Sequence, residues 1–240
     1  MLHILEGHRI PDATFRIRSR GTARDVTTAE IFANKMVIAF GVPGAFTPTC
    51  SSTHVPWYEE LASTFKRRGI DDIVCISVND SFVMDAWKRA ENADSITFLA
   101  DGNGSLTEAM GLLVDKTAAG LGRRSRRYSM VVRDGVIERM FVEGPVGDPL
   151  EVSDADTMLT FLGGAAPHDI VLVTKPGCEH CARARAMLVE ADLPWAELPA
   201  SPRVLRALPG ARTTPQVFVD GRHVGGADDL GAWLGPRPQA

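Results

Sequence analysis

The sequence predicts an α/β protein built as two units in tandem. Short apolar runs alternate with helical patterns through residues 35–100, which is typical of strands joined by helices. A stretch of small residues then interrupts the chain at 163–167, and the same alternation returns on a smaller scale after it. With 240 residues, 45% of them hydrophobic and 23% charged, the chain can bury a core.

The first unit contains three apolar runs, at 35–40, 72–78 and 95–100, that predict a βαβ arrangement. Two further runs, YSMVV and VIERMFV, flank Asp134 and Gly135, and an Asp-Gly pair at this place is a strong signal for a hairpin. Parallel strands followed by an antiparallel hairpin and a helix fit the thioredoxin plan.

The second unit repeats this plan after the stretch GGAAP. DIVLVTK predicts a strand, residues 178–190 a helix, WAEL a strand, and QVFVD with RHV a hairpin around Asp220 and Gly221, with a last helix from about Asp228. We therefore expect two thioredoxin-fold domains in tandem, at 1–162 and 168–240, joined by a linker at 163–167.

Composition and charge exclude several classes of protein. The net charge of −4 provides no basic field for nucleic acid, and the arginine cluster at 123–127 is too short to change this. The first residues do not resemble a secretory signal, and no apolar run has the length to span a membrane, so a cytoplasmic location is expected. Four cysteines are too few for a disulfide framework, which leaves reactive, metal-binding or buried thiols.

The first cysteine motif is PGAFTPTC, at 43–50. Thr47 and Pro48 predict the N-cap and first position of a helix through WYEELASTFKRR, so Cys50 falls in its first turn, where free amides and the helix dipole favour a thiolate. The Thr47 hydroxyl could bond both the sulfur and an oxygen substrate, and Arg127 is a candidate for a nearby cation. A plain apolar cysteine with a solvated arginine fits the spacing equally well.

A family resemblance separates these alternatives. PGAFTPTCSSTHVPWY, with NDSFVMDAW and RRYSMVVRDGVI, closely resembles the peroxiredoxins, in the branch that includes peroxiredoxin 5. The resemblance implies that Cys50 is the peroxidatic cysteine and that Pro43, Thr47 and Arg127 activate it. It also implies attack on a peroxide to leave a sulfenic acid. Some members of this branch have a resolving cysteine near the domain end, but GPVGDPLEVSDAD has none, so this domain looks like a one-cysteine type.

Two other residues of the first unit are of interest. Cys75 lies inside the apolar run IVCISV, which favours a buried core thiol over a reactive one. His54 lies four residues after Cys50 on the same helical face. It could tune the pKa of Cys50, or it could be a hydrogen-bonded packing residue.

The second cysteine motif is Cys178-Glu-His-Cys181, directly after a predicted strand and at the start of a helix. Helix placement and Lys175, three residues earlier, would lower the pKa of Cys178, and the spacing lets Cys181 reach it. A zinc site would need two more ligands, and no matching pair follows, so no metal is expected.

TTPQVFVDGRHVGGADDL, further along, resembles the glutaredoxins. The resemblance implies that Pro215 is cis and that the backbone of Thr214 pairs with glutathione. It also implies that Ala227 and Asp228 receive the γ-glutamyl carboxylate and amine. The glutathione-binding set is therefore expected to be Lys175, Cys178, Thr214, Pro215, Ala227 and Asp228. Glu179 and His180 depart from the proline and aromatic residue usual between the cysteines of glutaredoxins, which leaves the redox potential open.

Together the two motifs predict a glutathione-dependent peroxidase for hydrogen peroxide and alkyl hydroperoxides. Glutathione would be a reducing co-substrate, with no bound cofactor. Glutathione would trap the Cys50 sulfenic acid, Cys178 would release Cys50, and a second glutathione or Cys181 would finish the cycle. The alternatives are a protein deglutathionylase, a peroxide sensor whose Cys50 does not cycle, and an iron–sulfur module. We expect a homo-oligomer, a dimer or tetramer, with possible transfer between subunits.

Overall fold

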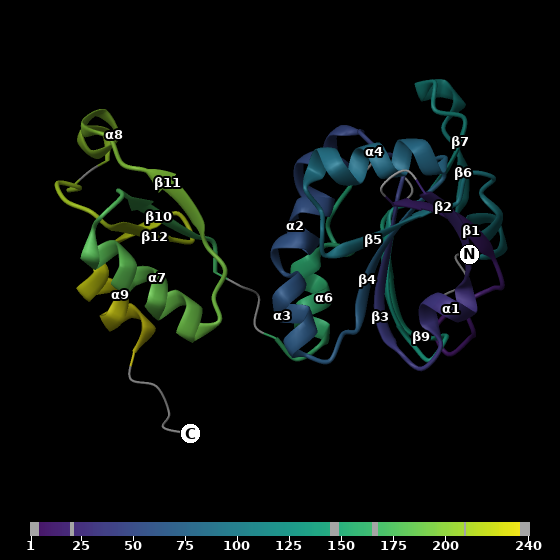
Figure 1. The fold of residues 1–240 in the computed structure, drawn as a ribbon, viewed down its shortest axis with the longest axis horizontal. Helices are drawn as coiled ribbons and strands as arrows, with labels where there is room; N and C mark the ends of the chain where they lie inside the picture. The colour runs from purple at the N-terminus through teal and green to yellow at the C-terminus, as the bar shows by residue number, and fades with distance from the viewer. Residues whose placement is uncertain (1–4, 20–21, 145–148, 165–167, 209, 236–240) are drawn as a thin grey trace. The chain divides into compact units, whose positions relative to one another are not determined.

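The computed structural model describes residues 5–19, 22–144, 149–164, 168–208 and 210–235. The chain divides into two compact units, Met1–Ala165 and Ala166–Ala240 (Figure 1). The last three residues of the predicted linker lie outside the described residues, so the linker bounds stay a prediction.

A five-stranded mixed sheet forms the centre of the first unit, in the order β5-β4-β3-β8-β9. Strands β3, β4 and β5 are parallel, and β8 pairs antiparallel with both β3 and β9. The hairpin predicted at Asp134 and Gly135 joins β8 to β9, with both residues at positive φ. The strands are β3 (Met36–Val42), β4 (Asp72–Ser77), β5 (Ile96–Ala100), β8 (Tyr128–Arg133) and β9 (Val136–Val142).

Two hydrophobic clusters fill this unit. One is formed with the helices α2, α3, α4 and α6 and contains Cys50, Tyr58, Trp87 and Met158; the other contains side chains of β1, α1 and α5. In Figure 1, α2, α3 and α6 lie together on one side of the sheet. The helices are α1 (Thr28–Phe32), α2 (Val55–Glu60), α3 (Ala62–Arg67), α4 (Ser81–Glu91), α5 (Ser105–Ala109) and α6 (Ala155–Phe161).

Two small hairpins were not predicted from the sequence. They are β1 (Thr14–Ser19) with β2 (Thr22–Thr27), and β6 (Leu113–Asp115) with β7 (Arg123–Ser125), and a 3₁₀ turn at Thr117–Ala119 lies between β6 and β7. In β1 only Phe15 and Ile17 alternate with arginines, and β2, β6 and β7 show no such alternation, so period-two patterning gives only a weak signal for these hairpins.

The helix predicted after Thr47 is not continuous. A π-turn at Cys50–His54 precedes α2, and a turn at Leu61 separates α2 from α3. Pro56, in the first turn of α2, has no N–H to donate to a carbonyl of the preceding turn. Its absence favours the wider hydrogen-bond spacing of a π-turn there.

The second unit has a four-stranded sheet in the order β11-β10-β12-β13. Helix α7 begins directly after Cys178, and α9 begins at Ala227, one residue before its predicted start; helix α8 was not predicted. The prediction of two α/β units on the thioredoxin plan is confirmed. The elements are β10 (Ile170–Thr174), α7 (Glu179–Ala191), β11 (Ala196–Pro199), α8 (Pro202–Ala207), β12 (Gln216–Val219), β13 (Arg222–Gly225) and α9 (Ala227–Leu234).

Candidate active site

Cys50 lies just after the loop that leaves β3 and is fully buried, at 0% exposure. The loop begins at Pro43, and it is anchored where the Ala45 N–H donates to Asn79 Oδ1 at 3.0 Å. The Thr47 hydroxyl donates to the Gly44 carbonyl at 2.9 Å. Because its proton is engaged there, the Thr47 oxygen presents its lone pairs as acceptors, which suits a substrate O–H better than a thiolate.

The π-turn determines where the side chain of His54 lies. The N–H of Val55 donates to the carbonyl of Cys50, a bond that spans five residues. Cys50 therefore begins this turn and His54 ends it, and both side chains are fully buried. A π-turn of this kind often marks a functional position in a helix.

His54 bonds on both sides of its ring. Nε2 lies 3.1 Å from the carbonyl of Ser153, and Nδ1 lies 3.0 Å from Arg127 Nη1. A carbonyl only accepts and a guanidinium only donates, so the geometry assigns the proton to Nε2 and makes Nδ1 an acceptor. Burial, helped by the charge of Arg127 and opposed by the bond to Ser153, lowers the pKa of His54 to about 3, so the ring is neutral.

Arg127 immediately precedes β8 and is almost completely buried, at 2% exposure. Its bond to His54 links it to the far end of the turn that starts at Cys50. Sequence reasoning proposed Arg127 and His54 separately for this site. It did not indicate that the two are bonded to each other across 73 positions.

Cys75, on β4, is fully buried in the same core cluster as Cys50, as the sequence predicted. Its pKa lies well above the ordinary value, because burial raises it most and Cys50 raises it further, while Arg127 lowers it. Cys50 and Arg127 are therefore both within electrostatic range of Cys75. A thiol held protonated in this way is a poor nucleophile.

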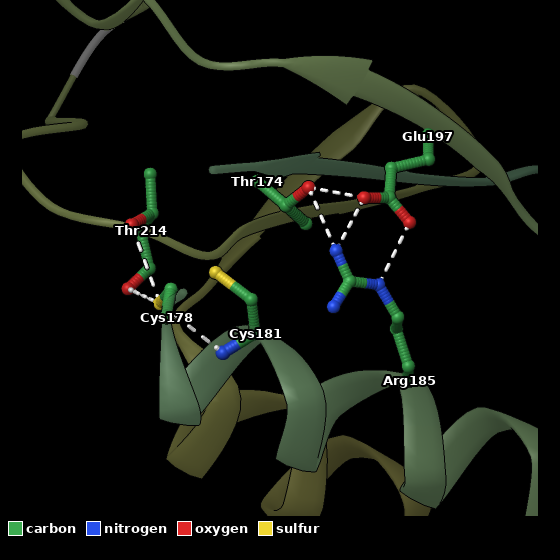
Figure 2. Close-up of polar contacts among 6 residues, drawn as sticks. All are labelled: Thr174, Cys178, Cys181, Arg185, Glu197 and Thr214. Carbon is green, nitrogen blue, oxygen red and sulfur yellow. Dashed lines mark hydrogen bonds and ion pairs between the residues drawn. The ribbon is translucent and has the colours of Figure 1, made fainter. Parts of the chain in front are cut away.

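Cys178 occupies the N-cap of α7, so the helix begins at the thiol itself. Its sulfur accepts from the Cys181 N–H at 3.3 Å and from the Thr214 hydroxyl at 3.5 Å, and it lies 3.5 Å from the Thr214 carbonyl (Figure 2). Cys178 is half-buried, whereas Cys181 is fully buried. The peptide bond between Thr214 and Pro215 is cis, as expected.

The two thiols of this motif differ in acidity. Burial raises the pKa of Cys178, but hydrogen bonds from Cys181 and Thr214 and the charge of Lys175 outweigh it, so the net pKa is lowered. The pKa of Cys181 is raised, first by burial and then by its hydrogen bond to Cys178. Cys178 is therefore the thiol that ionises first and the better nucleophile near neutral pH.

A groove of about 920 Å³ opens beside Cys178. Of the predicted glutathione-binding set, Lys175, Cys178 and Thr214 line it. Glu179 and His180, to which the sequence gave no binding role, also line it. So do Arg206 and Arg212, which sequence reasoning missed because they belong to no recognised motif.

The remaining predicted binding residues lie outside the lining of this groove. Ala227 is the first residue of α9 and is buried. Asp228 follows it, and its carboxylate pairs with Arg183 at 2.5 Å. A ligand amine at Asp228 would therefore have to share or replace this arginine.

Among the residues that the structure describes, no group of three or more His, Cys, Asp or Glu side chains is placed to hold a metal ion. None of the described helices is both long and apolar enough to cross a membrane.

Two family models match the chain, Redoxin over residues 5–159 and Glutaredoxin over residues 170–224. Hybrid peroxiredoxin hyPrx5 of Haemophilus influenzae is 51% identical over 233 residues, which covers 94% of this chain and 97% of that protein. A peroxiredoxin of Synechocystis, sll1621, is 50% identical and matches 65% of this chain and 90% of its own length.

Solved structures match the first unit. Reduced Prx3 of Vibrio vulnificus in complex with hydrogen peroxide is 45% identical, with a TM-score of 0.63, over 66% of this chain and 99% of that one. A one-cysteine peroxiredoxin, the antioxidant protein of Plasmodium falciparum, is 34% identical, with a TM-score of 0.64, over 66% and 98%. The chain therefore belongs to the peroxiredoxin family, as a hybrid in which a glutaredoxin domain follows the peroxiredoxin domain.

Proposed function

We propose that this peroxidase depends on glutathione and that its two domains perform successive steps on one sulfur. The observation that carries the proposal is the contrast between two cysteines. Cys50 is fully buried at the start of the turn whose last residue, His54, bonds to Arg127, whereas Cys178 is half-exposed and its pKa is lowered. The peroxiredoxin domain has no other thiol suited to resolve Cys50, because Cys75 is buried in the core with a raised pKa.

In the first step, the Cys50 thiolate attacks the terminal oxygen of a hydroperoxide. A sulfur–oxygen bond forms, the oxygen–oxygen bond breaks, and the leaving alkoxide or hydroxide departs as an alcohol or water after taking a proton. Arg127 would donate to the developing negative charge, and Thr47 would accept from the substrate O–H. Pro43, at the start of the loop, completes the motif. The product on Cys50 is a sulfenic acid.

In the second step, glutathione attacks this sulfenic acid, which yields a mixed disulfide and water. Cys50 has no exposed surface, so the turn at Cys50–His54 must open to admit a tripeptide. The wider hydrogen-bond pairing of the π-turn and the break at Leu61 favour opening at this short segment.

In the third step, Cys178 attacks the glutathione sulfur of the mixed disulfide, and Cys50 leaves as a thiolate. Lys175, Arg206 and Arg212 offer positive charge to the carboxylates of glutathione in the groove. A second glutathione, or Cys181, then releases the first from Cys178. The sum is one hydroperoxide and two glutathiones converted to alcohol, water and glutathione disulfide.

The test is NADPH oxidation coupled through glutathione reductase, with peroxide as the only oxidant. We expect sustained turnover by the wild type and none by Cys50→Ser. Cys178→Ser should stall with one glutathionyl group on Cys50, detectable by mass spectrometry, and should recover when a separate glutaredoxin is added. A single stoichiometric oxidation of the wild type would instead support a sensor, and turnover by Cys50→Ser on glutathionylated proteins alone would support a deglutathionylase.

We also propose that the protein is a homo-oligomer, a dimer or tetramer, in which glutathione passes from Cys50 of one chain to Cys178 of another. The predicted linker 163–167 spans at most about 17 Å when extended, which restricts transfer within one chain. Mixing the Cys50→Ser and Cys178→Ser chains tests this. Turnover that recovers and does not fall on dilution would support transfer between chains of one oligomer. An inactive mixture, or one whose turnover falls on dilution as with a separate glutaredoxin, would contradict it.

A further inference from the structure

The Glu143 carboxylate is the centre of an unusual group of hydrogen bonds. Glu143 immediately follows β9 and is 2% exposed. Its Oε1 atom accepts from the N–H groups of Glu151, Val152 and Ser153 at 2.8–2.9 Å and from the Ser153 hydroxyl at 2.8 Å. Although burial raises the pKa of this carboxyl, these donors lower it by more, so the group is a carboxylate.

These bonds fix one particular acceptor, the carbonyl of Ser153. That carbonyl accepts from His54 Nε2 at 3.1 Å and from the Tyr58 hydroxyl at 3.0 Å. The next residue, Asp154, caps α6 by accepting from the Thr157 N–H at 2.8 Å. The segment from 151 to 154 is therefore held at both ends, and it places the Ser153 carbonyl against His54, the last residue of the π-turn.

The connection continues through His54 to Arg127, as described above. The main chains of Glu143 and Arg127 are also bonded directly, because the Glu143 N–H donates to the Arg127 carbonyl at 3.0 Å. Glu143 is thus joined to Arg127 through the backbone and, independently, through Ser153 and His54. A neutral imidazole that accepts from one N–H of the planar guanidinium constrains its orientation.

We propose that Glu143 is a positioning residue for the peroxide reaction: through Ser153 and His54, its carboxylate holds the Arg127 guanidinium in the orientation that serves Cys50. The proposal rests on the function proposed above. It assigns a role to a carboxylate that touches neither the sulfur nor the substrate. It also accounts for a buried charge at the start of a segment that contains no cysteine.

The first test compares Glu143→Leu with Glu143→Gln. Leucine removes the acceptor, whereas glutamine keeps a carbonyl oxygen for the same donors. The readout is the second-order rate of Cys50 oxidation by hydrogen peroxide, followed by stopped-flow tryptophan fluorescence. Trp87 is a suitable reporter, because its Nε1 donates to the hydroxyl of Ser51 at 2.8 Å.

We expect Glu143→Leu to slow this reaction about 10- to 100-fold, the range that misplacing a catalytic group by about 1 Å can cause. Glu143→Gln should stay closer to the wild type than to Glu143→Leu. The control is Glu138→Gln on β9, an exposed carboxyl paired with Arg133, which should react at the wild-type rate.

A double-mutant cycle separates positioning from plain destabilisation. In an Arg127→Met background, Glu143→Leu should cause little further slowing, because the group that it positions is already gone. Equal slowing in both backgrounds would overturn the proposal, as would a folded Glu143→Leu that reacts at the wild-type rate. If Glu143→Leu does not fold, Ser153→Ala removes one donor and should slow the reaction less, again only when Arg127 is present.

The outcomes distinguish this inference from the proposed function. A wild type in which peroxide does not oxidise Cys50 would overturn both. A wild type that reacts rapidly, with a folded Glu143→Leu or Ser153→Ala that shows no dependence on Arg127, would overturn the positioning role alone.

Discussion

Each half of the chain has an arginine within electrostatic range of its thiol site, but the two arginines have different partners. Arg127 is buried and bonds to the neutral ring of His54. Arg185, on α7, is half-exposed and makes a two-bond ion pair with Glu197, at 2.9 and 2.5 Å (Figure 2). The bond that Arg127 makes with His54 therefore leaves its charge unopposed by that partner, within electrostatic range of Cys75, whereas Arg185 is paired with a carboxylate.

The difference fits the two reactions that we propose. A peroxide is small and develops negative charge on oxygen, so a buried cation serves that step. A glutathione disulfide is bulky and must reach its thiol from solvent. There the local hydrogen bonds to Cys178 from Cys181 and Thr214 lower the pKa of the thiol without a buried cation.

The largest expected effect concerns the neutral state of His54 and the stability of the first half. The pKa of His54 falls from 6.5 to about 3 on folding. Stability from this residue is complete above pH 6.5 and is lost as the pH falls toward 3, with a slope of about 1.4 kcal/mol per pH unit and a total on the order of 4–5 kcal/mol.

Urea unfolding of the full chain, measured from pH 7 to pH 4, checks this. His54→Phe should be less stable at pH 7, because it removes the hydrogen bonds that the ring makes with Arg127 and with the Ser153 carbonyl, but it should lose less stability on acidification. The exposed His8→Gln serves as the control and should keep the wild-type slope. If the free energy of unfolding of His54→Phe falls with pH as steeply as that of the wild type, the neutral state of the His54 ring would be contradicted.

Arg127→Met should give the next largest effect. Removing the buried cation should slow peroxide oxidation of Cys50 about 10²- to 10³-fold, the usual cost of losing one preorganised donor to a developing charge. Alkylation of Cys178 should be unchanged, so the loss would be confined to one half. The matched control is Arg123→Met, which removes an exposed arginine paired with Glu108. If Arg127→Met and the wild type react with peroxide at the same rate, the buried cation does not serve the peroxide step, and the contrast between Arg127 and Arg185 has no functional meaning.

Local signals in the sequence predicted much of this arrangement. The Asp134-Gly135 hairpin and the placement of Cys178 at a helix start depend on a few neighbouring residues, and both are observed. The bond from Arg127 to His54 joins residues 73 positions apart, and its geometry depends on a π-turn that no local pattern indicates. The role that we propose for Glu143 is harder still to predict, because three of its four donors are backbone N–H groups, which leave no signal in the sequence.

The acidity of Cys178 gives a smaller effect that sharpens the comparison. Thr214→Val removes a hydroxyl that donates to the sulfur, and such a bond contributes about 0.5–1.5 kcal/mol. The pKa of Cys178 should rise, so the pH profile of its alkylation should move to higher pH and the rate at pH 7 should fall about three- to tenfold. Peroxide oxidation of Cys50 should not change. Thr213→Val, at the neighbouring exposed position, is the matched control. If it shifts the pH profile of Cys178 alkylation as much as Thr214→Val does, the Thr214 hydroxyl is not the group that lowers the pKa of Cys178.

The smallest expected effect tests whether Glu197 neutralises Arg185. Hydrogen bonds from Arg185 and then from Thr174 lower the pKa of Glu197 from 4.5 to about 2. Its stabilisation is therefore present above pH 4.5 and is lost as the pH falls toward 2. Because both side chains are more than one-third exposed, water limits the contribution to about 1 kcal/mol or less.

Glu197→Gln should accordingly lower the stability of the full chain slightly at pH 7, and the gap from the wild type should close below pH 4.5. It should also leave the charge of Arg185 uncompensated within range of Cys178 and Cys181. The alkylation profile of Cys178 should then move to lower pH, opposite to Thr214→Val, while Arg185→Met should not move it downward. A Cys178 profile that is the same in Glu197→Gln and the wild type would mean that the solvent already screens Arg185, and that the carboxylate serves only to join β11 to α7.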